Sequence, residues 1–165
     1  MNFAIDSRTV IRFAEENDAP VILAFIKELA DYEGMLEKVT ATEELLLQTI
    51  FRDKRAEVLI CEYDDEPVGF ALFFHNFSTF LGKPGLYLED IYVIPEMRNH
   101  GVGKKMISVL AKIALERDCG RLEWWCLDWN RKSIDFYLGL GAEAMNDWTV
   151  YRVSGQKLME IAKIV

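Results

Sequence analysis

Two acidic residues lie in the middle of an apolar stretch, residues 86–94, where an uncompensated charge is costly. Glu89 and Asp90 follow Leu-Tyr-Leu and precede Ile-Tyr-Val-Ile. A carboxylate held partly out of water can bind an ammonium group, or accept a proton from an amine through a water molecule. The pair therefore indicates a cation site or a general base. The alternative is a structural acid that bonds to the backbone or to a lysine.

A glycine-containing elbow follows this stretch directly. Pro95 ends the apolar run, and Arg98, Gly101 and Gly103 lead into a strongly helical sequence. Two glycines allow a ligand to approach the backbone closely, and the first turn of a helix has unpaired N–H donors and a partial positive charge. Strand, elbow and helix in this order predict a site for an anion such as pyrophosphate. The alternative is an ordinary helix start without a ligand.

Two well-known phosphate motifs do not match this elbow. A nucleotide-triphosphate P-loop needs a glycine five places before Gly103 and a serine or threonine after the lysine, but Arg98 and Lys105 stand there. The dinucleotide fingerprint needs a third glycine where Met106 stands, and an early strand of a doubly wound sheet. Neither an NTPase nor a dinucleotide-binding domain is therefore predicted.

The composition is that of a soluble globular protein with one domain over residues 1–165. Hydrophobic residues make up 51% and charged residues 28% of the chain, and the net charge is −8. This charge argues against nucleic acid or an anionic membrane as a partner, and favours a small cation. The start of the chain lacks a signal-peptide pattern, and no stretch has the length to span a bilayer, so we expect a cytoplasmic protein. Three cysteines and two histidines favour neither a disulfide framework nor a metal site.

The hydrophobic periodicity predicts an α/β protein with a mixed sheet and the order β α α β β β α β α β. Thr40 and Glu43 predict a capping box for the second helix, and Gly34 and Gly141 each end a helix. The expected strands are residues 9–13, 56–63, 68–74, 86–94, 121–127 and 148–153. The expected helices begin near Pro20, Thr40, Val102 and Arg131, with an optional one at residues 157–163.

The R-x-x-G-x-G elbow at the mouth of a helix, together with this element order, resembles the GNAT superfamily of acetyl-CoA-dependent N-acetyltransferases. Within it, residues 86–93, Leu-Asp-Trp-Asn at 127–130 and Asp-Phe-Tyr at 135–137 resemble the spermidine/spermine (diamine) acetyltransferases. The Leu-Asp-Trp-Asn run is nearer the thialysine-acetylating branch. The resemblance extends from about residue 10 to 153. It implies the GNAT acyl-CoA N-acyltransferase fold, acetyl-CoA as co-substrate, a small amine substrate and a homodimer.

The resemblance also implies roles for individual residues. Glu89 would be the water-mediated base or the amine-binding carboxylate, and Tyr137 the general acid. The residues implied to bind acetyl-CoA are Ile91, Tyr92, Val93, Arg98, Asn99, His100, Gly101, Val102, Gly103, Lys104, Asn130, Ser133 and Tyr137. Those implied to bind the amine are Tyr32, Glu33 and Glu89, and two further acids, Asp90 and Asp128, could bind the second positive end of a diamine. Ser78 and Phe80 stand where polyamine enzymes tend to carry Asp and Trp, which argues against long polyamines.

The implied reaction explains why these residue types are needed. A primary alkylammonium has a pKa of about 10.4 and must lose a proton before it attacks a thioester. Glu89 could relay that proton, the N–H of Val93 could stabilise the oxyanion, and Tyr137 could protonate the departing thiolate. The sequence thus predicts direct acetyl transfer to a diamine, polyamine or thialysine-like amine. Two alternatives are an enzyme for an unrelated small amine or protein amine, and a non-catalytic acyl-CoA-binding module.

Overall fold

The computed structural model of the chain describes residues 2–165, which form two compact units, one that ends at Trp125 and one that runs from Cys126 to Val165. The first unit contains a six-stranded sheet in the order β1-β2-β3-β4-β5-β6. Its strands are β1 (Asn2–Ala4), β2 (Thr9–Phe13), β3 (Glu57–Tyr63), β4 (Glu66–Ser78), β5 (Lys83–Val93) and β6 (Leu122–Trp124). Neighbours pair antiparallel except β5 and β6, which pair parallel. The predicted mixed sheet is confirmed, and the three-residue β1 was too short for its pattern to be predicted.

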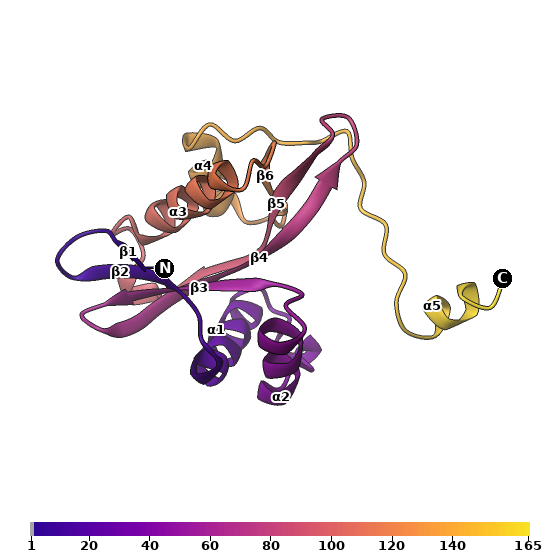
Figure 1. Cartoon of the computed structure of the whole chain (residues 1–165), viewed down its shortest axis with the longest axis horizontal. Coiled ribbons are helices and arrows are strands. Elements are labelled where there is room, and N and C mark those ends of the chain that lie inside the picture. Colours follow the sequence, from indigo (N-terminus) through magenta and orange to yellow (C-terminus); the bar gives the residue numbers. More distant parts are fainter. Residues whose placement is uncertain (1) are drawn as a thin grey trace. The chain divides into compact units, whose positions relative to one another are not determined.

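Helices cover both faces of this sheet (Figure 1). The turns and helices are η1 (Glu16–Asp18), α1 (Ala19–Tyr32), η2 (Leu36–Lys38), α2 (Glu43–Leu46), the π-helix η3 (Leu47–Arg52), η4 (Pro95–Met97) and α3 (Val102–Glu116). On the α1 and α2 face, Phe25 stacks on Phe70 at 5.8 Å within a core that includes Ile22, Ile60 and Tyr92. The opposite face is covered by α3, whose Met106 and Leu110 are fully buried. Each helix thus packs through one apolar stripe, as its spacing predicts.

The predicted capping box at Thr40 is wrong. Thr42 caps α2 instead, because its backbone is extended and its Oγ1 accepts the N–H of Leu45 at 3.2 Å. Glu43 is therefore the first helical residue rather than the third, and Thr40 precedes the helix. Two threonines two residues apart offer the same local pattern, and the backbone geometry decides between them.

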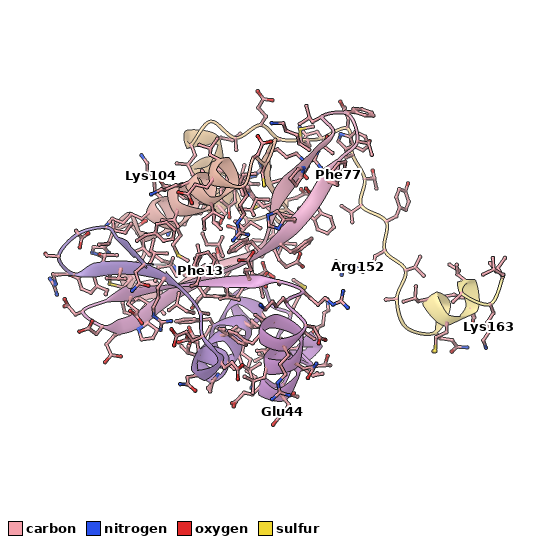
Figure 2. All side chains as sticks on the ribbon, in the orientation of Figure 1. Phe13, Glu44, Phe77, Lys104, Arg152 and Lys163 are labelled. Atoms are coloured by element: carbon pink, nitrogen blue, oxygen red, sulfur yellow. The ribbon has the colours of Figure 1, made fainter. Side chains whose placement is uncertain are left out.

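The second unit contains α4 (Arg131–Gly139) and α5 (Gly155–Ile161). The predicted strand at residues 148–153 is wrong: within the described part of the chain these residues are extended but pair with no strand. Their side chains, including the labelled Arg152, stand out from the ribbon (Figure 2). A strand-like sequence forms a strand only where a neighbouring strand supplies its hydrogen bonds. The pattern at residues 148–153 is compatible with a strand, but these residues have no such neighbour within the described part of the chain.

None of the helices in residues 2–165 has both the length and the apolar character needed to cross a membrane.

Candidate active site

Strand β5 separates from β6 at its carboxyl end and leaves an open edge there. The parallel ladder joins residues 86–88 to residues 122–124 and goes no further within the described residues. The N–H of Ile94 donates to the C=O of Val68 at 3.0 Å, so Val93, opposite Gly69, is in a non-hydrogen-bonded pair. The backbone groups of Val93, and by alternation those of Ile91, therefore point away from β4 towards the open edge. An extended ligand could bond to both backbone groups of Ile91 and to the N–H of Val93, because the C=O of Val93 already accepts the Nε–H of Arg98.

A β-bulge at Glu89 changes which side chains share a face of β5. Leu72 pairs with Asp90 and the next residue, Phe73, pairs with Leu88, so Glu89 is the extra residue. Strict alternation would place Leu88 beside Asp90, but the bulge places Tyr87 there instead. Tyr87, Asp90 and Tyr92 accordingly lie on the α1 and α2 face of the sheet.

Three carboxylates gather where this face meets the end of α1. Asp90 is half-buried, and desolvation, helped by the nearby charges of Glu89 and Glu33, raises its pKa from 3.8 to about 6. Glu33, which caps α1 and is half-buried, also has a raised pKa because of desolvation. Glu89 is exposed at the bulge. Among residues 2–165 no lysine or arginine forms an ion pair with these three acids, so the group attracts a cation from solution.

The elbow between β5 and α3 has the geometry of an anion site. Asn99 and Gly101 both have left-handed backbones, with φ of 65° and 80°. The first bond of the helix runs from the N–H of Lys105 to the C=O of Gly101 at 3.0 Å. The N–H groups of residues 102–104 precede it and have no acceptor within the helix, which is the arrangement that binds phosphate oxygens. The side chain of Lys104 projects from this end of α3 (Figure 2).

Arg98 supports the elbow with both its backbone and its side chain. Its N–H closes η4 on the C=O of Pro95 at 3.2 Å, and its Nε donates to the C=O of Val93 at 2.8 Å. The guanidinium carbon lies 5.0 Å from the ring centroid of Tyr32 and 5.3 Å from that of Tyr92. Arg98 therefore ties the end of β5 to the end of α1, the two places that carry Asp90 and Glu33.

His100 and the backbone around it are exposed. The Nδ1–H of His100 donates to the C=O of Arg98 at 2.9 Å. This bond holds the ring against the elbow. The predicted elbow residues thus lie together, and their contact with acetyl-CoA stays a prediction.

The other four predicted residues lie in the second unit. Asn130 caps α4, because its Oδ1 accepts the N–H of Ser133 at 3.3 Å. Asn130, Ser133 and Tyr137 are spaced by three and four residues and so share one face of the helix. Tyr137 is half-buried and packs against Phe136 at 5.3 Å, whereas Asp128 is exposed. The structure brings the first three together, and their roles stay predictions.

Residues that the sequence analysis missed extend the Asp90 face towards β6. Tyr87 lies 5.1 Å from Phe74 and meets Trp125 edge-on at 5.8 Å. Glu123 is the register partner of Tyr87 on β6. The alternating sequence Arg-Leu-Glu-Trp-Trp of residues 121–125 could have indicated that Glu123 and Trp125 share a face. No sequence signal revealed the bulge that brings this face into line with Asp90.

A hollow elsewhere in the first unit carries no comparable chemistry. It has a volume of about 400 Å³ and is lined by residues that include Phe13, Ile50, Lys54 and Glu57. Glu57 is already bound there by Arg117. In residues 2–165 no three His, Cys, Asp or Glu side chains are placed to hold a metal ion.

Comparison with known proteins finds a family match that includes the elbow and the open edge of β5. The model of the Acetyltransferase (GNAT) family matches residues 22–142, more than half of the chain. The chain belongs to the GNAT acetyltransferase family. It is therefore an acetyl-CoA-dependent N-acetyltransferase that transfers acetyl to an amine, and the predicted family and fold are confirmed.

Curated relatives of this GNAT chain are named for their amine substrates. Thialysine N-epsilon-acetyltransferase of Bos taurus is 36% identical over 165 residues, which cover 93% of this chain and 96% of that protein. Spermidine/spermine N(1)-acetyltransferase-like protein 1 of Homo sapiens is 34% identical over 163 residues, which cover 92% of this chain and 23% of that protein. The first name describes transfer of an acetyl group to an amine nitrogen, and the second compares its protein with an enzyme that does so. Both argue against a non-catalytic binding module.

Solved structures share the fold of this GNAT chain. An integron cassette protein from the mobile metagenome of V. cholerae has a TM-score of 0.81 at 24% identity, over 96% of this chain and 99% of that one. The aminoglycoside N-acetyltransferase AAC(6')-Iy, solved in complex with CoA, has a TM-score of 0.72 at 20% identity, over 92% and 98%. At these identities the likeness concerns the fold alone.

Proposed function

We propose that this GNAT enzyme acetylates the primary amine of a small cationic substrate: a diamine, a polyamine or a thialysine-like amino acid. The observation that carries the proposal is the cluster of Glu33, Glu89 and Asp90. Two of these acids are partly desolvated, and no lysine or arginine among residues 2–165 pairs with any of them. An alkylammonium ion would neutralise the cluster and would gain from each of its charges. The substrates that the relatives' names describe are amines of this kind.

We propose that the elbow and the open edge of β5 hold acetyl-CoA. The amides of residues 102–104 would bind the pyrophosphate, and the backbones of Ile91 and Val93 would bond to the pantetheine as an added strand does. The left-handed backbones of Asn99 and Gly101 support this assignment, because they turn successive N–H groups to one side. The thioester would then lie near the bulge, beside Glu89 and Asp90.

The proposed reaction is a direct attack with no covalent enzyme intermediate. Glu89 takes a proton from the ammonium through a water molecule, and the amine nitrogen then bonds to the thioester carbon. The N–H of Val93 stabilises the tetrahedral oxyanion, the C–S bond breaks, and Tyr137 gives its proton to the thiolate. The second proton of the amine nitrogen then passes to the Tyr137 oxygen, which leaves a neutral amide and a neutral tyrosine. The exposure of Glu89 supports the water-mediated route, and the half-buried Asp90 would bind the substrate cation.

We further propose that residues 1–165 act as one GNAT domain within a homodimer. The family match from residue 22 to 142 includes parts of both compact units, which supports one domain. The end of the second unit supports a dimer, because it exposes large apolar side chains: Trp148 is 72% exposed, Tyr151 90% and Ile164 79%. A second copy of the chain would cover apolar side chains that are exposed to this extent. A cytoplasmic location stays a prediction.

Thiol release tests the proposed function. The full chain is incubated with acetyl-CoA and, separately, with diamines, polyamines, thialysine and lysine, and free CoA is followed over pH. We expect release with at least one of these amines and a rise of the rate with pH that Glu89→Gln flattens. Glu66→Gln, which removes an exposed acid at the start of β4, is the matched control and should leave the profile unchanged. No release with any of these amines would refute the proposed function, and a wild-type profile for Glu89→Gln would remove its role as base.

A further inference from the structure

The sheet face that carries Asp90 continues into an aromatic and charged surface at the β6 edge. Phe74, Tyr87 and Trp125 form an aromatic wall, and Trp125 is 56% exposed. Desolvation raises the pKa of the Tyr87 hydroxyl, and the charges of Glu89 and Glu123 raise it further. Glu89 and Glu123 therefore both lie close enough to this hydroxyl for their charges to act on it. The wall links the acid cluster to β6 within one unit.

A carboxylate and a guanidinium stand side by side at the end of this wall. Arg121 Nη2 lies 3.1 Å from Glu123 Oε2, and the two side chains are 38% and 32% exposed. Asn76 Nδ2 donates to the same carboxylate oxygen at 2.8 Å and holds it in place. Gly85 makes room for Asn76, since a Cβ at Gly85 would lie 2.3 Å from Asn76 Oδ1. Asn76 thus holds the pair in position, and both side chains of the pair stay partly exposed to solvent.

Both members of the pair keep hydrogen-bonding capacity. Glu123 Oε1 accepts no hydrogen bond from the described residues. The guanidinium of Arg121 has five N–H donors on three nitrogens, and its Nη2 is the nitrogen that lies beside Glu123. A free α-amino acid carries an ammonium and a carboxylate on one carbon, so its two charges match a carboxylate and a guanidinium 3.1 Å apart. Arginine is suited to the carboxylate, because its planar fork binds both oxygens.

We propose that Arg121, Glu123, Tyr87 and Trp125 form a head-group subsite that binds the α-ammonium and α-carboxylate of an amino acid whose side-chain amine is acetylated. This inference rests on the proposed function, since it places the reacting amine at Glu89 and Asp90. It selects amino acids with a terminal side-chain amine, such as lysine or thialysine, over diamines and polyamines, which lack the carboxylate that Arg121 binds.

The spacing along β5 agrees with a substrate of that length. Tyr87 and Asp90 are three residues apart with a bulge between them, which gives less than about 10 Å at ~3.3 Å per residue. The five bonds from the α-carbon of lysine to its terminal nitrogen span about 6 Å when extended. The side chains of the subsite and of the acid cluster cover the remaining distance. The substrate stem would lie along Tyr87 and Trp125.

Matched pairs of substrates test the subsite. Lysine and 1,5-diaminopentane differ only in the α-carboxylate, so the ratio of their kcat/KM values isolates its recognition. We expect the full chain to prefer lysine by at least about 10-fold, and Arg121→Gln to lower this ratio about 10-fold while the diamine changes by less than about 3-fold. Arg121→Lys keeps the charge but loses the fork, and should give an intermediate ratio.

Glu123→Gln supplies an independent readout. Both substrates present an ammonium to Glu123, so this variant should lower kcat/KM for both by a similar factor and leave the ratio within about 3-fold. Arg8→Gln is the control, because it removes another exposed guanidinium that pairs with an acid, Asp64, at the β2 and β3 end of the sheet. It should leave both values unchanged.

Two results would overturn the subsite, and neither is a failure of the proposed function. One is a wild-type preference for the diamine. The other is a lysine-to-diamine ratio that Arg121→Gln and Arg121→Lys leave unchanged while acetylation itself continues. Absence of thiol release with every amine would instead refute the proposed function on which the subsite rests.

Discussion

Replacement of Asp90 by asparagine should make the protein more stable and less active at neutral pH. The half-buried carboxyl has a pKa of about 6, raised by desolvation and by Glu89 and Glu33, against 3.8 for an ordinary aspartate. An acid whose pKa is raised by folding binds more protons in the native than in the unfolded state between these values. The ionised carboxyl therefore lowers stability as pH rises through about 4 to 6, and the full cost remains above that window.

The size of the effect follows from this shift. About two pKa units at 1.36 kcal/mol each give at most about 3 kcal/mol at pH 8, less where water reaches the carboxyl. Near pH 4.5 the same linkage gives a destabilisation by Asp90 of only about 1 kcal/mol. Asp90→Asn removes the charge and keeps the shape, so it should raise the free energy of unfolding by about 1 to 3 kcal/mol at pH 8. For a chain of this length that is a rise in Tm of about 3 to 8 °C.

Urea unfolding and thermal melts at pH 4.5 and pH 8 measure this difference, with kcat/KM for the amine measured alongside. Asp18→Asn is the matched control with the opposite sign, because the Arg12 ion pair lowers the pKa of Asp18. That pair stabilises the fold above the ordinary aspartate pKa and is lost as pH falls, so the control should destabilise at pH 8. The reasoning is refuted if Asp90→Asn is no more stable than wild type at pH 8. It is also refuted if the substitution raises the free energy of unfolding by the same amount at both pH values.

Three further substitutions test the other parts of the site. Tyr137→Phe should lower kcat about 10-fold or more with acetyl-CoA affinity unchanged, since it removes one proton donor, and unchanged turnover would exclude it as the acid. Arg98→Gln should raise KM for both the amine and acetyl-CoA several-fold, because Arg98 ties Val93 to Tyr32; an effect on one substrate alone would contradict that coupling. Gly101→Ala should cost about 1 kcal/mol of stability and raise KM for acetyl-CoA, because its φ is 80°. Gly139→Ala, in the helix α4 with no neighbour near its added Cβ, should stabilise the protein slightly instead. If both glycine substitutions changed the stability in the same direction, the argument from the left-handed backbone of Gly101 would be refuted.

Local patterns predicted most of the elements around the site. The apolar stripe of α1, the hairpin of β3 and β4 and the elbow before α3 all follow from spacing and from glycine positions within one segment. The cap of α4 by Asn130 was predicted for the same reason, since an N-cap bonds to a residue three places on. The choice of Thr42 over Thr40 and the unpaired residues 148–153 were not, because one depends on loop geometry and the other on a partner strand.

By itself, the sequence determined which chemistry this protein carries: carboxylates in an apolar strand, an anion-binding elbow at a helix start, and a family. Only the tertiary structure decided which of those side chains are exposed and which of them lie on the same face of the sheet. The bulge exposes Glu89, half-buries Asp90 and turns Tyr87 to the same face, and the parallel register then adds Glu123 to that face. The physical reason is that a bulge shifts every later side chain of a strand to the other face of the sheet. Pairing between strands distant in the chain produces that shift, so no local pattern of residues predicts it.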